Sequence, residues 1–143
     1  MSAERPPDPT AAPADAELRI PAETAYVAVL RTTSAALAAR HDFTLADIED
    51  LRMAVGEAAV VALANGADGT DGAGRHPGLV VRYWFGERTA TVSIATPGTV
   101  PAHLDDLSWQ MMRALADDVR TGTTPGLLEI VLTHHATPLD VPS

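Results

Sequence analysis

Midway along the chain stands the run Met53-Ala-Val-Gly-Glu-Ala-Ala-Val-Val-Ala-Leu-Ala64, in which Glu57 is the only charged residue. Thr44 ahead of the run is a good N-cap with Asp47 at the third helical position, and Gly66 is a natural C-terminal stop. These signals predict a helix from Thr44 to Gly66. A lone carboxylate is costly to bury without a partner, so Glu57 is either a solvated edge residue or a functional group.

Placing residues about 100° apart around this helix puts its main apolar sector almost opposite Glu57. Asp50, Ala54 and Val61 lie on the same side as Glu57, and the next turn of that side is apolar. We therefore expect a loop, a ligand or a partner chain to cover it. The sector expected to face the core contains Ile48, Leu51, Val55, Ala58, Ala59 and Ala62.

Before this helix, residues 17–20 alternate polar and apolar and then meet Pro21, which predicts a short strand followed by a helix to about residue 40. Arg31 is expected near the edge of that helix's core stripe. The stripe is predicted to contain Tyr26, Val29 or Leu30, Thr33 and Leu37.

After the central helix, a Gly-rich and Asp-rich loop over residues 66–78 leads to strands at 79–85 and 89–96, joined by a Gly86-Glu87 turn. A third helix is predicted from Trp109 to about Val119, and a last strand at 127–133. The resulting order is β-α-α-β-β-α-β. It predicts an α+β fold, a two-layer sandwich with a four-stranded mixed sheet covered on one face by three helices.

Composition indicates one domain at residues 17–135, between a disordered tail at 1–16 and a second tail at 136–143. The formal charge of −9 argues against nucleic-acid binding. The chain has no cysteine, no apolar stretch of membrane-spanning length and no leader, so we expect a cytoplasmic protein without membrane association. His134 and His135 should point to opposite faces, both solvated, and we predict no metal site.

The run Asp50-Leu-Arg-Met-Ala-Val-Gly-Glu-Ala-Ala59 resembles the first nucleotide-site motif of the anti-sigma-factor serine kinases, a branch of the GHKL ATPase superfamily. Residues 108–119 and 127–133 are similar to the C-terminal part of actinobacterial members. The resemblance implies a GHKL (Bergerat-like) fold and a homodimer that sequesters an alternative sigma factor of the sporulation or stress type. It also implies phosphorylation of a STAS-domain antagonist, with ATP and Mg²⁺ as cofactors.

By this resemblance Glu57 matches the family's general base, and Arg31 matches a first-helix arginine that touches the sigma factor and the antagonist. Val61 replaces the asparagine that holds Mg²⁺, and Thr96 replaces the aspartate that bonds adenine. Gly98 keeps the glycine of that second motif. The glycine-rich phosphate segment is absent, since residues 99–108 contain no glycine.

These departures argue against ATP and Mg²⁺ binding, because an oxygen ligand and a base-pairing carboxylate are missing. The sequence therefore predicts an anti-sigma factor whose kinase activity is lost or weak, with Glu57 catalytic only if that activity persists. Thr96 and Gly98 would be the remnants of the nucleotide site. Two alternatives stay open: an active ATP-dependent serine kinase acting on a STAS-domain protein, and a degenerate GHKL-fold regulator of another partner.

Overall fold

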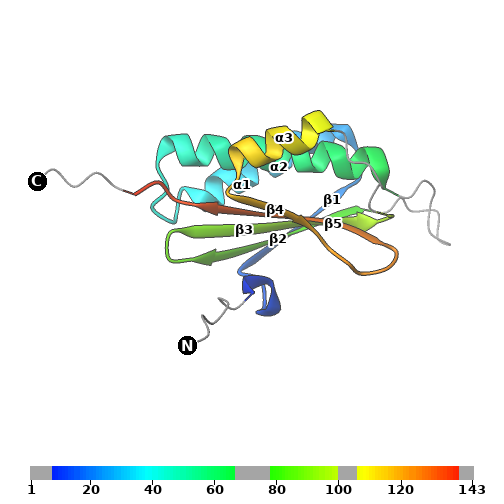
Figure 1. Cartoon of the computed structure of the whole chain (residues 1–143), viewed down its shortest axis with the longest axis horizontal. Coiled ribbons are helices and arrows are strands. Elements are labelled where there is room, and N and C mark those ends of the chain that lie inside the picture. The colour runs from blue at the N-terminus through cyan, green and yellow to red at the C-terminus, as the bar shows by residue number, and fades with distance from the viewer. Residues whose placement is uncertain (1–7, 67–77, 100–105, 139–143) are drawn as a thin grey trace, which may run out of the picture.

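The computed structural model describes residues 8–66, 78–99 and 106–138. Within them, three α-helices cover one face of a five-stranded sheet (Figure 1). The strands lie in the order β1-β2-β3-β5-β4. The elements are η1 (Pro9–Ala11), β1 (Ala16–Pro21), η2 (Thr24–Tyr26), α1 (Val27–Ala38), α2 (Leu45–Asn65), β2 (Gly78–Gly86), β3 (Thr89–Pro97), α3 (Asp106–Leu115), β4 (Asp118–Thr121) and β5 (Leu127–His135).

The predicted α+β sandwich is confirmed, with two corrections to its sheet. The sheet has a fifth strand, and every described pairing is antiparallel, so the sheet is not mixed. The extra strand, β4, occupies the part of the chain that the sequence assigned to the end of the third helix. Val119 pairs with Leu132 and is buried, while Asp118 and Arg120 on either side are exposed. Pairing with the free edge of β5 outweighs the local helical pattern there.

Helix α2 is built as the sequence predicts. Thr44 and Asp47 form a capping box, in which each side chain accepts a hydrogen bond from the other residue's backbone N–H. The predicted inner sector is buried, apart from Ile48, which is half-buried. α2 therefore contributes much of the core and fixes the position of its outer face.

Helix α1 is rotated relative to its predicted stripe. Tyr26 and Val29 are exposed, and the buried residues are Val27, Leu30, Ser34 and Ala38. Apolar residues occur on several sides of this helix, so the pattern alone does not select a face. The hydroxyl of Ser34 donates to the Leu30 carbonyl at 2.8 Å and shares a 2.7 Å hydrogen bond with the buried Tyr83 hydroxyl. Burial raises the pKa of Tyr83 to about 12.

The β2–β3 hairpin turns one residue later than predicted. Gly86 still pairs with Thr89, so Glu87 and Arg88 form the turn, and Arg88 takes the left-handed conformation with φ of 57°. The predicted loop at residues 66–78 lies mostly outside the described residues. No helix in the described part of the chain is long and apolar enough to cross a membrane.

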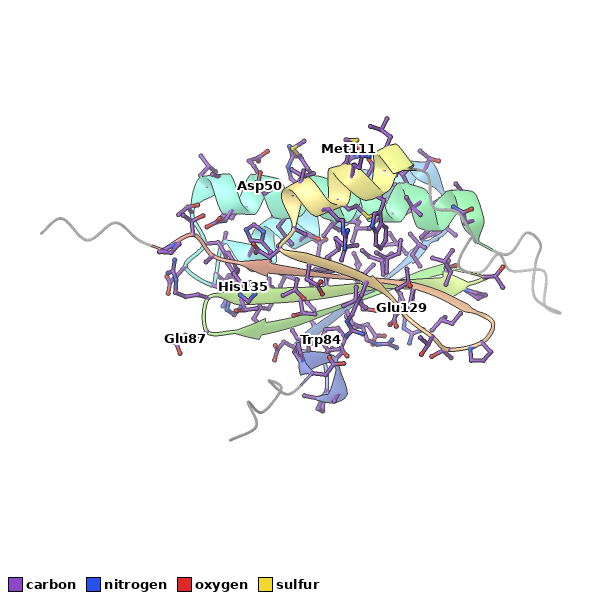
Figure 2. All side chains as sticks on the ribbon, in the orientation of Figure 1. Asp50, Trp84, Glu87, Met111, Glu129 and His135 are labelled. Carbon is purple, nitrogen blue, oxygen red and sulfur yellow. The ribbon has the colours of Figure 1, made fainter. Side chains whose placement is uncertain are left out.

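Residues 8–15, which the sequence assigned to a disordered tail, lie against the face of the sheet that the helices leave open (Figures 1 and 2). The Trp84 indole N–H donates to the Ala12 carbonyl at 2.8 Å, and the Phe85 N–H donates to the Asp15 carboxylate at 2.7 Å. Arg120 pairs with Asp8 at 3.2 Å. These contacts are long-range, which is why composition does not reveal them.

A buried polar cluster ties the start of α2 to the end of β5. His134 is buried, contrary to the prediction of a solvated side chain, whereas His135 is exposed as predicted. His134 Nε2 lies 3.2 Å from Asp47 Oδ1, and the Thr137 N–H and hydroxyl donate to the same carboxylate at 2.9 and 2.7 Å. With the bond from the Thr44 N–H, Asp47 receives hydrogen bonds on both oxygens.

Candidate functional site

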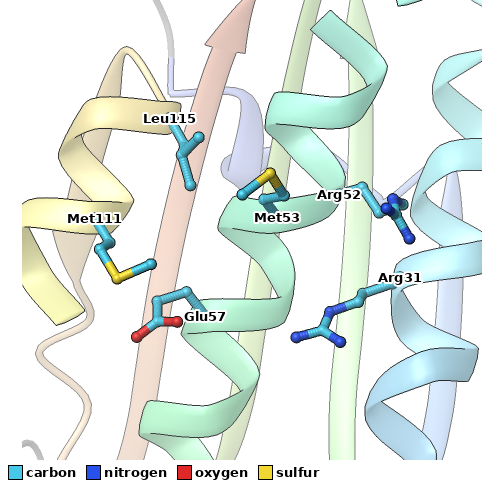
Figure 3. A pocket seen from close by; sticks show the side chains of 6 residues that line it. All are labelled: Arg31, Arg52, Met53, Glu57, Met111 and Leu115. Atoms are coloured by element: carbon cyan, nitrogen blue, oxygen red, sulfur yellow. The ribbon is translucent and has the colours of Figure 1, made fainter. Parts of the chain in front are cut away.

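A shallow groove crosses the outer face of the helical layer. It has a volume of about 330 Å³ and takes side chains from all three helices (Figure 3). Figure 3 shows the two arginines on the α1 side of α2, and Glu57 and Met111 on the α3 side. The lining residues are Arg31 from α1, Arg52, Met53 and Glu57 from α2, and Met111 and Leu115 from α3.

Helical spacing places these side chains together. Met53 and Glu57 are four residues apart on α2, and Met111 and Leu115 are four apart on α3, so each pair lies on one face of its helix. α3 packs on α2 through Met112, which is fully buried, and leaves its neighbour Met111 on the groove. Of these two adjacent methionines, Met112 therefore packs in the core and Met111 lies on the surface.

Glu57 is half-buried in this groove. The structure gives its carboxylate no hydrogen bond or ion pair within the described residues. On its side of the helix Ala54 and Val61 are buried, but Val60 is exposed, so that side is only partly covered. Part of the cover comes from α3, and not from the loop, ligand or partner chain that the sequence suggested. A carboxylate that the fold leaves without a donor is available to a ligand or a partner.

Arg31 reaches the groove by lying against the backbone of α2. A Cβ added at Gly56 would stand 2.2 Å from Arg31 Nε and 2.9 Å from Nη2. Glycine inside a helix costs roughly 1 kcal/mol relative to alanine, so a close approach accounts for its presence here. Among the described residues Arg31 has no ion-pair partner. The packing of α1 on α2 therefore brings Arg31 and Glu57 to one groove.

Thr96 and Gly98 lie elsewhere. Gly98 bridges to Gly66 just past the end of α2, and the Thr96 Cγ2 would be 3.3 Å from a Cβ at Gly66. Gly66 is nine residues beyond Glu57, about 13 Å along the helix axis. Neither Thr96 nor Gly98 lines the groove. Of the predicted site residues, Arg31 and Glu57 therefore line the groove, whereas Thr96 and Gly98 lie near the C-terminal end of α2.

The residues present do not fit a bound Mg²⁺. Val61 is only 6% exposed and belongs to the hydrophobic core, and its side chain has no oxygen for a hard cation. No group of three or more acidic, histidine or cysteine side chains suited to a metal occurs in the described residues.

Sequence reasoning missed four residues of the groove: Arg52, Met53, Met111 and Leu115. The i, i+4 spacing of Met53 with Glu57 and of Met111 with Leu115 was a usable signal. It did not show which face of α3 would meet α2, because that depends on where α3 ends and β4 begins.

Comparison with known proteins places this sequence in a family. The chain is 30% identical to the serine-protein kinase RsbW of Bacillus velezensis over 131 residues, which cover 78% of this chain and 79% of that protein. This chain belongs to the RsbW serine-protein kinase family. It is also 34% identical to the RsbW kinase of Bacillus pumilus over 85 residues, or 57% of this chain and about half (49%) of that protein. No protein-family model matches the sequence.

The fold agrees with a solved RsbW-containing structure. The chain aligns with the crystal structure of the RsbU and RsbW domains of Rv1364c from Mycobacterium tuberculosis, with a TM-score of 0.66 and 19% identity. The alignment covers 90% of this chain and 35% of that one. At this identity the likeness bears on the fold alone, and it agrees with the GHKL-like architecture expected from the sequence.

Proposed function

We propose that this chain is a cytoplasmic anti-sigma factor that binds and sequesters an alternative sigma factor of the sporulation or stress type, with kinase activity lost or weak. Family membership supports the class of protein. The proposal is supported by a combination of two features. Val61 is buried, and Arg31 lines a groove where it has no ion-pair partner among the described residues. The chain keeps a surface for a protein and lacks an oxygen at a position where the family's chemistry calls for one.

Loss of kinase activity follows from the chemistry of phosphoryl transfer. Mg²⁺ neutralises the charge that develops on the transferred group, and positioning with electrostatic stabilisation supplies nearly all of the catalysis. Val61 offers no ligand for that ion. Thr96 has no carboxylate for the adenine amino group, and an unsatisfied buried group costs about 1 to 3 kcal/mol.

Sequestration needs only a surface that recognises the partner. Arg31 lies in the middle of α1, and its guanidinium has no ion-pair partner among the described residues. Arginine is enriched among the residues that dominate binding energy. By the family resemblance, the proposal extends to a homodimer and to a STAS-domain antagonist that competes for the same surface.

The test is purification of the tagged chain from native lysate of its host, with bound proteins identified by mass spectrometry. We expect a sigma factor to co-purify with the wild type and to be lost with Arg31→Glu, at nearly unchanged melting temperature. Arg40→Glu, an exposed charge reversal just beyond α1, is the matched control and should retain the sigma factor. Absence of any sigma factor from the wild-type sample would contradict the proposal.

A second candidate, an active serine kinase, is favoured by one observation: Glu57 remains half-exposed in the groove, where it could polarise a hydroxyl. Transfer of radiolabel from ATP to a STAS-domain protein separates the two. Transfer that is abolished by Glu57→Gln would establish the kinase. Co-purification of a different regulator in place of a sigma factor would support the third alternative, a degenerate GHKL-fold regulator.

A further inference from the structure

We infer that the open face of the sheet is a docking surface for an extended peptide segment of a partner protein, and that residues 8–15 occupy this surface in cis. The partner segment carries a lysine or arginine that reaches the Glu129 carboxylate, and a carboxylate that takes the place of Asp8 on Arg120. This surface lies on the side of the sheet away from the helices and their groove (Figure 2). The inference therefore goes beyond the proposed function and does not depend on it.

The N-terminal segment, residues 8–15, shows what the surface recognises. The Trp84 indole N–H on β2 donates to the backbone carbonyl of Ala12, and Arg120 on β4 pairs with the Asp8 carboxylate. Since β4 is an edge strand and β2 lies next to the opposite edge, the segment crosses most of the sheet. The surface thus holds a peptide through one main-chain hydrogen bond and one charge at its end.

The contacts of the N-terminal segment are weak. None of its eight residues is buried, and its composition is Asp, Pro, Thr and Ala, so it buries little apolar area. The Asp8 and Arg120 side chains of the ion pair are 51% and 44% exposed, and ion pairs this exposed contribute little. Segments held in this way open locally at low cost in free energy. A partner segment with better contacts can therefore displace it.

The sheet beneath the segment is nevertheless shielded from water. Strand alternation places Thr91, Ser93 and Val131 on the face opposite the helices, and each is at most 2% exposed. Trp84 on the same face is 9% exposed. This face is covered to the degree of a protein interior, so displacement of the segment requires another one to replace it.

The N-terminal segment does not fill the space above the sheet. A cavity of about 490 Å³ remains between them, within the range of volumes that accept ligand groups. The segment contributes only short side chains to its wall, and a longer side chain on a competing segment would fill it. The lining residues are Thr10, Ala12, Pro13 and Ala14 from the segment, and Glu17, Arg82, Trp84 and Glu129 from the sheet.

The charges in the cavity favour a cationic side chain. Glu17 already forms ion pairs with two arginines. Glu129 accepts a hydrogen bond from the Ser93 hydroxyl at 2.6 Å and has no ion pair among the described residues. The ring of Trp84 lines the same cavity, and an ammonium or guanidinium group is attracted to such a ring. A lysine or arginine on the partner segment satisfies both groups.

The test is a titration of the ¹⁵N-labelled full-length chain with synthetic peptides, followed by the two tryptophan indole signals in NMR spectra. The probe has the sequence of residues 8–15 with Ala14→Arg, and the control peptide carries Ala11→Arg, at an exposed position that does not line the cavity. We expect the Trp84 signal to shift and the signal of Trp109, on α3, to stay. The probe should bind at least tenfold more tightly than the control peptide.

Variants of the full-length chain test the two contacts separately. Asp8→Ala combined with Asp15→Ala weakens the tethered competitor, so affinity for the probe should rise at least tenfold. Glu129→Gln should lower affinity for the probe about tenfold and leave that of the control peptide unchanged. Glu87→Gln, an exposed carboxylate in the β2–β3 turn, is the matched control and should have no effect on either peptide.

Four results would overturn the inference. The first is an unmoved Trp84 signal when the weakened chain is titrated with millimolar probe, and the second is equal affinity for the two peptides. The third is binding of free arginine as tightly as the probe, which would indicate a small-molecule site. The fourth is a Trp84 shift that depends on the concentration of the weakened chain alone, which would place a second copy of the chain on this face.

Discussion

Two carboxylates on α2, ten residues apart, stand in opposite situations. Asp47 is 3% exposed and receives hydrogen bonds on both oxygens from Thr44, His134 and Thr137. Glu57 is half-buried in the groove and has no hydrogen bond within the described residues. The fold uses the Asp47 carboxylate and leaves that of Glu57 available. The same helix therefore fixes the architecture at its N-terminal end and contributes Glu57 to the groove from its middle.

The largest expected effect is the loss of Asp47. Asp47→Ala removes the acceptor shared by two backbone N–H groups and two side chains, and leaves His134 buried without that partner. We expect the free energy of unfolding, measured by urea titration, to fall by about 3 kcal/mol or more. Glu57→Ala on the same helix is the control and should change it by less than about 0.5 kcal/mol. Equal effects of the two substitutions would remove the distinction between them.

Lowering the pH should also reduce the free energy of unfolding, because it protonates Asp47. Burial raises its pKa, but the hydrogen bonds from Thr137, Thr44 and His134 outweigh burial and hold the pKa well below its ordinary value. The stability that this carboxylate contributes is therefore present above its unfolded pKa of about 3.9 and is lost as the pH falls from there toward the folded value. Urea titrations from pH 6 down to about pH 3 should show a steeper loss for the wild type than for Asp47→Asn. Parallel pH profiles of the two proteins would contradict this.

A smaller effect tests how Arg31 is positioned. Gly56→Ala places a Cβ where the Arg31 guanidinium now lies, and that flexible side chain must move. We expect affinity for the sigma factor, measured by calorimetry, to fall about tenfold, while the free energy of unfolding stays the same or rises by up to about 1 kcal/mol because alanine favours the helix. The next glycine of the chain, Gly66, ends α2 and is not a suitable control. Ala64→Gly, at an exposed position of the same helix, should lower stability without changing affinity.

The smallest effect is expected at Glu57 itself. Glu57→Gln keeps the shape of the side chain and removes its charge, and no donor in the described structure depends on that charge. Sigma-factor affinity should change less than about threefold, which corresponds to roughly 0.6 kcal/mol. A loss comparable to that of Arg31→Glu would show that Glu57 carries the partner contact.

Local rules predicted the elements whose signals are self-contained. The capping box of Thr44 and Asp47, the inner sector of α2 and the hairpin strands all follow from neighbours in sequence. The errors arose where contacts between residues far apart in the sequence determine the structure. Strand β4 forms because β5 offers a free edge, and α1 is oriented by the Ser34–Tyr83 hydrogen bond. The same holds for the site, since Arg31 and Glu57 were predicted but the methionines of the groove depend on how α3 docks.

We propose that this family member has kept a protein-binding surface and lost the nucleotide chemistry. Titration of the full-length chain with Mg·ATP in an isothermal calorimeter tests it most directly, since Val61 and Thr96 remove the contacts that the family resemblance assigns to Mg²⁺ and adenine. We expect no saturable heat. Saturable binding with a micromolar Kd would contradict it.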